Sequence, residues 1–325
     1  MVQKDGSWQW LLEGFKYELE ARVRPKTVEY YHDHARIFAR WAESAGIAEP
    51  RLLTKRDINT FLHWIVNNSS SAECKAGAGE EARRAESLRF HYYRGLKRFL
   101  SWLSAEGCLE QNPLDGIVFK APKDPPIEPY QLEHKDKFLA VLDHDWKVAK
   151  TLRQRMLAAR NRAIVYLFFE SGLRLQELAD LSIRDIDLNE QRVVARFGKM
   201  GKSRLCGFGP QTRKALWRYL SLRPSQVDGD RLWVTEEGRP LTSRGIQEIF
   251  RRLKADAGLK HVRGLVHKCR HTFATTLLKH TGDMKACQTL LGHSTLRMTQ
   301  RYTEYVQVEY ALKYYDGKGP LDWMS

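Results

Sequence analysis

The chain has 325 residues, 42% hydrophobic and 29% charged, which is enough apolar material for the cores of two domains. No apolar run approaches the ~20 residues of a membrane-spanning helix, and the first residues lack a signal peptide's apolar stretch, so a cytoplasmic protein is expected. Lysine and arginine outnumber aspartate and glutamate by 54 to 39, a net charge of +15. This excess favours a polyanionic partner, although it would also keep a protein soluble without one.

The first 121 residues have the apolar spacing of helices and predict a helical domain. Helices are expected over residues 26–45, after an N-cap at Thr54, and over residues 88–103. Residues 67–80 are small and polar and predict a loop. The aromatic residues of the helices are expected in the core. Basic residues lie off the apolar faces, as suits a domain that wraps a duplex, but a solvated surface explains them about as well.

A proline-rich segment separates the two halves of the chain. Four prolines stand between residues 121 and 129, and proline disfavours helix in the residue before it. We therefore predict domains at 1–121 and 131–325, joined by an extended linker at 122–130. The second domain is expected to end in a tail that starts at about residue 306.

The second domain is predicted to be mainly helical, with one small sheet. Helices are expected at 132–142 and 160–170, and again from residue 211 onward apart from a loop at 224–230. Residues 185–208 alternate around two turns and predict a small antiparallel sheet. The five cysteines are scattered without CxxC spacing, which favours reduced thiols over a disulfide or zinc framework.

Two of the candidate site clusters lie in the middle of the chain. Gly172 can end a helix, so a new one is expected near Arg174, and Glu177 stands three residues later on the same face. Their carboxylate and guanidinium can pair, although such pairs also occur on surfaces without any function. The turn GKMGK, residues 198–202, is placed at the tip of the predicted hairpin, where a lysine can reach a phosphate or a leaving oxygen.

The other two clusters lie near the end of the chain. In HKCRHTFAT, residues 267–275, His267 and Arg270 are expected on one face of a helix. His271 follows His267 by four residues and suggests a metal pair, but the glutamate of HExxH is missing. Two capping histidines are a further alternative. His293 follows Gly292, which can close a helix, and Tyr302 comes nine residues later.

Taken together, the four clusters place cations around one phenol. A phosphodiester gains negative charge on its oxygens as a nucleophile attacks, and fixed arginine and histidine donors stabilise that charge. A phenol has a pKa near ~10, so it needs a base or a cationic surrounding to attack at neutral pH. No carboxylate cluster that would hold a metal is visible, and the set needs no metal or other cofactor.

These residues resemble the tyrosine recombinase (phage integrase) family, whose motifs run R…K…HxxR…H…Y, and the Xer-type enzymes in particular. The segments GLRxxEL, HxxRHTFAT and LGHS…TxxY stand in order, and His293 follows His267 by 26 residues. The resemblance is strong over residues ~160 to 305 and looser in the N-terminal half. It implies a mainly α protein of the DNA breaking–rejoining fold, with a helical, SAM-like core-binding domain before an α-rich catalytic domain that holds a small antiparallel sheet.

The resemblance also implies roles for the residues of the site. Arg174 and Arg270 would clamp the scissile phosphate, and His293 would hydrogen-bond it. Tyr302 would attack as the nucleophile, and Glu177 would orient Arg174.

Two further roles concern proton transfer. Lys199 would protonate the leaving 5′ oxygen, and His267 would act as an acid or base. The usual family pattern GKGxKxR has a glycine after the first lysine, whereas Met200 stands there in this chain. Lys202 therefore competes for the acid role, although alignment with the start of the hairpin favours Lys199.

The resemblance further implies a site-specific recombinase that forms a 3′-phosphotyrosine and needs no ATP. Its partner would be double-stranded DNA carrying recombination sites, bound by four protomers that are monomers or weak dimers when free. Accessory proteins could assist, and integration, excision and resolution of dimers remain open as outcomes. The expected place is the cytoplasm, in association with the nucleoid.

Three rival readings remain. A type IB topoisomerase-like enzyme would share the chemistry but relax any plasmid. A DNA-binding protein without catalysis is opposed by the complete catalytic set. A zinc hydrolase built on His267 and His271 would be inhibited by chelators. Apolar residues in the tail from 306 to 325 suggest docking on a neighbouring subunit.

Overall fold

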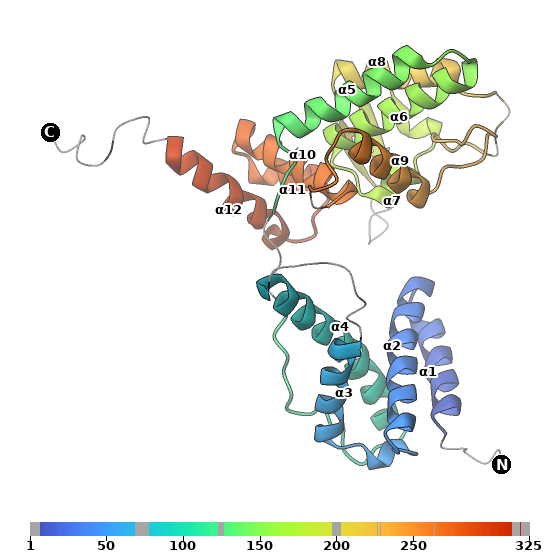
Figure 1. Ribbon diagram of the computed structural model, residues 1–325, viewed down its shortest axis with the longest axis vertical. Coiled ribbons are helices and arrows are strands. Elements are labelled where there is room, and N and C mark those ends of the chain that lie inside the picture. The colour runs from blue at the N-terminus through green and yellow to red at the C-terminus, as the bar shows by residue number, and fades with distance from the viewer. Residues whose placement is uncertain are drawn as a thin grey trace. The chain divides into compact units, whose positions relative to one another are not determined.

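The computed structural model describes residues 7–68, 78–122, 127–196, 203–225, 227, 229–262, 264–313 and 319. The chain separates into two compact units, Met1–Pro125 and Pro126–Ser325 (Figure 1). In the described residues, no helix is long and apolar enough to cross a membrane. Each unit has its own hydrophobic core and is described by itself.

The first unit is a set of helices packed around one core. A short 3-10 helix at Pro50–Leu52 separates the second and third of its α-helices, which are α1 (Trp8–Arg22), α2 (Pro25–Ser44), α3 (Lys55–Asn68) and α4 (Ala78–Ala105). The helices predicted over 26–45, after Thr54 and over 88–103 are confirmed.

Two features of this unit differ from the sequence prediction. Helix α1 was not delimited, although Ser7 caps it and its apolar residues Leu11 and Phe15 face the core at helical spacing. The predicted loop at 67–80 is helical at both edges. Helix α4 starts at Ala78, and Glu80 in its first turn pairs with Arg84 at 2.8 Å, which supports a helix start there.

Aromatic side chains fill the core of the first unit, as predicted. Phe38 lies between Trp8, at a ring-centroid distance of 5.8 Å, and Phe61, at 5.0 Å, in edge-to-face geometry with both. The indole of Trp8 donates its N–H to the carbonyl of Ile47 at 2.8 Å, so the polar atom of this buried ring has a partner. These rings bring α1, α2 and α3 into one core.

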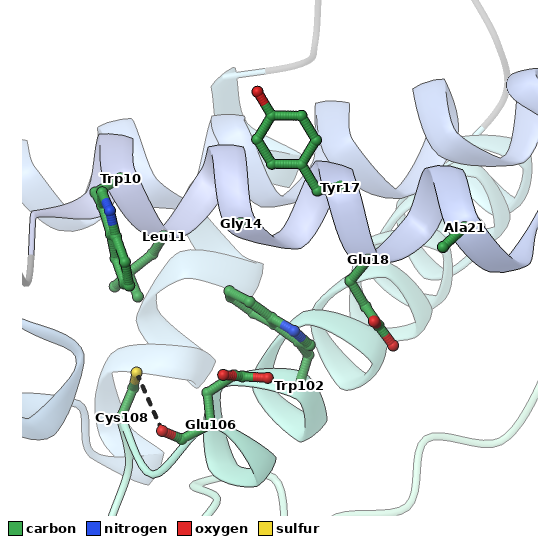
Figure 2. A pocket seen from close by; sticks show the side chains of 9 residues that line it. All are labelled: Trp10, Leu11, Gly14, Tyr17, Glu18, Ala21, Trp102, Glu106 and Cys108. Atoms are coloured by element: carbon green, nitrogen blue, oxygen red, sulfur yellow. Dashed lines mark hydrogen bonds between the residues drawn. The ribbon is translucent and has the colours of Figure 1, made fainter. Parts of the chain in front are cut away.

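A pocket of about 390 Å³ opens between α1 and the C-terminal end of α4 (Figure 2). Trp10 and Trp102 line it from the two helices, and Tyr17 stands at its edge with 70% of its surface exposed. A Cβ at Gly14 would lie 3.2 Å from the ring of Trp102, so glycine permits the close approach of α1 to α4.

The second unit is also mainly helical. Its helices are α5 (Leu132–Val148), α6 (Leu152–Ser171), α7 (Leu175–Ala179), α8 (Pro210–Leu222), α9 (Ser243–Asp256), α10 (Val266–Thr281), α11 (Met284–Leu291) and α12 (Leu296–Lys313). Helix α6 contacts α5, α8 and α10, which explains why its buried residues lie on several faces. The predicted helices at 132–142, at 160–170 and beyond residue 211 are confirmed.

The predicted small antiparallel sheet is present. Strands β1 (Ile186–Asp187), β2 (Arg192–Ala195) and β3 (Arg204–Gly207) pair in that order, with Val193 opposite Cys206. In the first turn Asp187 accepts hydrogen bonds from the backbone N–H groups of Asn189 and Glu190, both at 2.9 Å. The second turn, residues 197–202, lies outside the described residues. Strand β3 contacts α11 and α6 and so reaches the site.

A smaller apolar cluster joins α10, α11 and α12 in this unit, where Figure 1 shows these helices next to one another. Ala274, Cys287, Leu291 and Tyr302 are buried in it together with Val306. Val306, at which a separate tail was expected to begin, is therefore part of helix α12 and of the core around Tyr302.

Candidate active site

The first arginine of the site is held at a helix boundary. Helix α6 ends at Gly172 in the left-handed conformation, with φ 60° and ψ 19°. A Cβ there would lie 2.4 Å from the ring of Phe273, so only glycine fits. Arg174 is the N-cap of α7, and Glu177 accepts hydrogen bonds from its backbone N–H and its guanidinium, both at 2.8 Å. The predicted pairing is confirmed, but as a capping box rather than as two side chains on one helical face.

Glu177 binds a second arginine, Arg204 of strand β3. The guanidinium of Arg204 donates to both carboxylate oxygens, at 2.9 and 2.7 Å, in a bidentate pair. Burial alone would raise the pKa of Glu177, but the hydrogen bonds from Arg204 and Arg174 outweigh it and lower the pKa to about 2. Glu177 is therefore a fixed anion that orients two cations.

Arg270 is the most deeply placed cation of the site. It lies on α10 with 7% of its surface exposed, and its guanidinium donates to the backbone carbonyls of Gly172 and Leu291. Burial, followed by the charges of Arg174 and Arg204, lowers its pKa to about 10. Both hydrogen-bond acceptors are neutral, so no carboxylate in the described residues binds the positive charge of Arg270.

The C-terminal end of α11 gathers the three arginines. Successive carbonyls of Leu290, Leu291 and Gly292 accept from Arg204 at 2.8 Å, from Arg270 at 2.7 Å and from Arg174 at 3.3 Å, respectively. These are the carbonyls that a helix leaves unpaired, at the negative end of its dipole. Gly292 closes the helix in the left-handed conformation, and a Cβ there would lie 2.9 Å from the side chain of Arg204.

His293 follows this corner directly. Its Nδ1 lies 2.9 Å from the hydroxyl of Thr299, which is fully buried on α12. Burial, followed by the charges of Arg270, Arg174 and Arg204, lowers the pKa of His293 to about 4. The ring is therefore neutral at pH 7, with Nδ1 engaged and only Nε2 left for another partner.

Tyr302 stands on α12 among these groups. Only 5% of its surface is exposed, and its ring is nearly parallel to that of His293 at a centroid distance of 6.1 Å. Its hydroxyl lies 2.8 Å from Nδ1 of His271. Burial raises the pKa of Tyr302, against the opposing charge of Arg270. The cationic surrounding expected from the sequence is present, but burial is the stronger influence in the protein without DNA.

Of the remaining candidates, His267 and His271 lie in the described residues. His267 is exposed in the first turn of α10, one turn before the buried Arg270. Lys199 and Lys202 lie outside the described residues. His271 is bonded to Tyr302, and the described part of the chain has no group of three potential metal ligands.

The chemistry of this arrangement follows from its charges. Among the described residues of the site, three guanidinium groups meet one carboxylate, that of Glu177, which leaves an excess of positive charge beside a buried phenol. A buried excess of charge is costly unless a ligand matches it. The ligand that fits is an anion with several oxygens, and the phenol next to it can act as a nucleophile.

Three residues of the site received no role from the sequence. Arg204 is the final arginine of the GKGxKxR pattern, and Thr299 is the threonine of TxxY, so both had a recognisable position. His271 was considered only as a metal ligand or a capping residue. Its contact with Tyr302 spans 31 positions and has no local pattern.

Comparisons with known proteins show the family of the chain. Residues 145–307 match the phage integrase family. The chain is 31% identical over 309 residues to the tyrosine recombinase XerC of Lactobacillus delbrueckii subsp. bulgaricus, covering 90% of this chain and 93% of that protein. It is 35% identical over 307 residues to XerC of Alcanivorax borkumensis, covering 93% and 90%.

Among solved structures, the fold is similar to that of the XerH site-specific recombinase bound to a palindromic difH substrate. The TM-score is 0.73 over 96% of this chain and 85% of that chain, at 20% identity. The chain therefore belongs to the phage integrase family of tyrosine recombinases, enzymes that break and rejoin DNA. The predicted fold class, a helical domain before an α-rich catalytic domain with a small sheet, is confirmed with it.

Proposed function

We propose that this recombinase cleaves and religates DNA at specific sites through a 3′-phosphotyrosine on Tyr302. The observation that carries the proposal is the buried phenol beside an excess of guanidinium charge. A scissile phosphodiester supplies the missing negative charge, and that charge grows as the phenol attacks. The phosphotyrosine conserves the energy of the broken bond, so neither ATP nor a metal is needed.

In this proposal several residues bind the scissile phosphate and others hold them in place. Arg174 and Arg270 bind the non-bridging oxygens of the phosphate, and Glu177 together with the end of α11 holds both guanidiniums in place. Nδ1 of His293 lies 2.9 Å from the hydroxyl of Thr299; the proposal assigns that hydroxyl as the donor, so that Nε2 carries the N–H that faces the same phosphate.

Proton transfer to the leaving 5′ oxygen falls to a lysine. We assign it to Lys199, with Lys202 as the alternative, on the resemblance to the family pattern. A lysine ammonium group can supply the proton that an alkoxide leaving group needs. His267, exposed at the start of α10, is the further acid or base that the resemblance implies.

The partner in this proposal is double-stranded DNA with recombination sites, bound as a tetramer that joins two duplexes. The solved XerH complex contains a difH substrate, which supports a site of this kind. The biological outcome would be integration or excision of a mobile element, or resolution of DNA dimers, with or without accessory proteins. Its place would be with the nucleoid in the cytoplasm.

The test begins with the DNA site. Duplexes with a random central sequence and a nick at varied positions are incubated with the protein, and the adducts that survive denaturation are sequenced. Cleavage near the nick releases a short fragment that carries the 5′-hydroxyl. Once this fragment diffuses away, religation cannot occur, and the covalent adduct accumulates. The selected duplex should form an adduct with the native chain and none with Tyr302→Phe, because the variant lacks the attacking oxygen.

The matched control is Tyr305→Phe, since Tyr305 stands on the same helix one turn away, beside Lys279 rather than in the site. It should form the adduct at the native rate. An adduct with Tyr302→Phe would refute the assignment of the nucleophile. Relaxation of any supercoiled plasmid, without need for the selected site, would indicate a topoisomerase instead.

A further inference from the structure

The nucleophile of this site has a proton that something must accept. Tyr302 is buried, and burial raises the pKa of its hydroxyl, so the fraction of phenolate at neutral pH is very small. A buried phenol therefore attacks a phosphate only if a neighbouring group takes its proton as the new bond forms. The family resemblance assigned an acid or base role to His267, but that side chain is exposed in the first turn of α10.

The contact that the structure shows instead is between His271 and Tyr302. Nδ1 of His271 lies 2.8 Å from the phenol oxygen, within the range in which a general base abstracts a proton. The centroids of the two rings lie 5.6 Å apart, and the residues stand on the neighbouring helices α10 and α12. His271 is the residue directly after Arg270, so the same turn of α10 supplies the phosphate ligand and the group at the phenol.

The protonation state of His271 suits this position. Burial, followed by the charges of His267, Arg301 and Arg270, lowers the pKa of His271 to about 4, and Lys268 acts in the same direction. The ring is therefore neutral at pH 7 and has a free lone pair to accept a proton. A bound phosphodiester adds a negative charge beside these cations, which raises the proton affinity of His271 when the substrate is present.

We propose that His271 is the general base that accepts the proton of Tyr302 during cleavage and returns it during religation. The inference rests on the proposed phosphotyrosine chemistry. In cleavage the O–H bond of Tyr302 breaks, its proton moves to Nδ1 of His271, and the phenol oxygen bonds to phosphorus. The bond from phosphorus to the 5′ oxygen breaks, and the general acid protonates that oxygen. In religation each step reverses, and protonated His271 donates to the leaving phenol oxygen.

The experiment measures the single-turnover rate of adduct formation on the nicked duplex selected above. The first variants are His271→Ala, which removes the ring, and His271→Asn, whose side-chain oxygen can still accept a hydrogen bond near the position of Nδ1. Asparagine cannot take up the proton. Both variants should slow cleavage by about 100-fold or more, the usual contribution of a general base.

The matched control is His280→Asn. His280 stands on the same helix, is exposed, and is bonded through its Nδ1 to the backbone carbonyl of Thr276. It should cleave at the native rate. Thermal unfolding and affinity for the uncleaved duplex should be alike for all three variants and the native chain, which separates a loss of chemistry from a loss of folding or binding.

A second readout distinguishes proton transfer from positioning. The native rate should fall in acid as His271 becomes protonated, whereas the rate of His271→Asn should keep rising with pH as the phenol itself ionises. Replacing Tyr302 by a fluorinated tyrosine, whose phenol is more acidic, should restore much of the lost rate in His271→Asn. A pure positioning role predicts no such rescue.

The outcomes are separate from those of the proposed function. If the native chain forms no adduct, the phosphotyrosine proposal itself fails. If the adduct forms and His271→Asn cleaves at the native rate, His271 is not the base. A slow His271→Asn with the native pH profile and no rescue by fluorotyrosine would also overturn the inference.

Discussion

The two units of this protein bury different kinds of side chain. In the described residues of the first unit, the buried side chains are apolar or aromatic, and Phe38 lies among several aromatic rings of the core. The buried polar and charged residues in the described ranges of the chain lie in the second unit: Arg160, Asn161, Ser171, Glu177, Asp185, Thr212, Lys268, Arg270, Thr275, His293 and Thr299. The first core stabilises a fold, whereas the second also holds charge in place, which costs stability unless every charge is matched.

This difference between the units predicts that the largest loss of stability comes from a cavity in the aromatic core of the first unit. Phe38→Ala removes a fully buried ring between Trp8 and Phe61, which should cost the first unit about 3 to 5 kcal/mol. Hydrogen exchange of the α2 amides in the intact chain measures this loss. As a control, Tyr17→Ala at an exposed position of α1 should change the free energy of unfolding of the first unit by less than about 0.5 kcal/mol. Equal protection in the native chain and Phe38→Ala would show that this core does not stabilise the unit.

A smaller effect is expected from the titration of the buried carboxylate. The pKa of Glu177 lies at about 2, below its usual value of 4.5, so its charge stabilises the fold fully above pH 4.5. That contribution, about 3 kcal/mol from the size of the shift, should be lost as the pH falls from 4.5 toward 2.

Calorimetry of the native chain and Glu177→Gln across this window tests the prediction. The variant should be less stable at pH 7, and the difference should shrink as the pH falls. His271 and His293, whose lowered pKa values also reduce stability in acid, are present in both chains, so their contribution cancels. A difference that does not depend on pH would show that the charge of Glu177 contributes nothing.

The smallest effect is expected from a substitution that removes one polar contact and changes no charge. Thr299→Val removes the hydroxyl beside Nδ1 of His293 at nearly constant volume, so the ring is no longer held in one tautomer. Cleavage of the nicked duplex should slow by about 10-fold, as is common when such a supporting contact is lost. Thr276→Val, on α10 outside the site, is the control. A native rate in Thr299→Val would mean that His293 needs no support from α12.

Much of the fold could be predicted because its signals are local. Gly172 and Gly292 end helices where a left-handed residue is needed, and alternation between residues 185 and 208 predicts the sheet. Helix α1 falls in the region predicted to be helical, but the prediction gives no bounds for it, despite a serine cap and a regular apolar spacing. The extent of α12 was misjudged because the buried partner of Val306 is a cluster built from three helices.

The site was predictable only as a set of residues. Arg174, Arg270, His293 and Tyr302 are brought together by the structure, but the sequence gives no reason why His271 rather than His267 should face the phenol. That choice depends on how α12 packs against α10. The pairing of Arg204 with Glu177 likewise joins positions 27 residues apart across a strand and a helix, and only tertiary structure determines it.

The meeting of three arginines at the end of α11 has a consequence for the order in which the protein is made. Arg174, Arg204 and Arg270 leave the ribosome before residues 290–292, whose carbonyls hold their guanidiniums. Tyr302, the proposed nucleophile, follows later still. A partly synthesised chain can therefore expose these basic residues before the carbonyls that order their guanidiniums, and the proposed nucleophile, have been added.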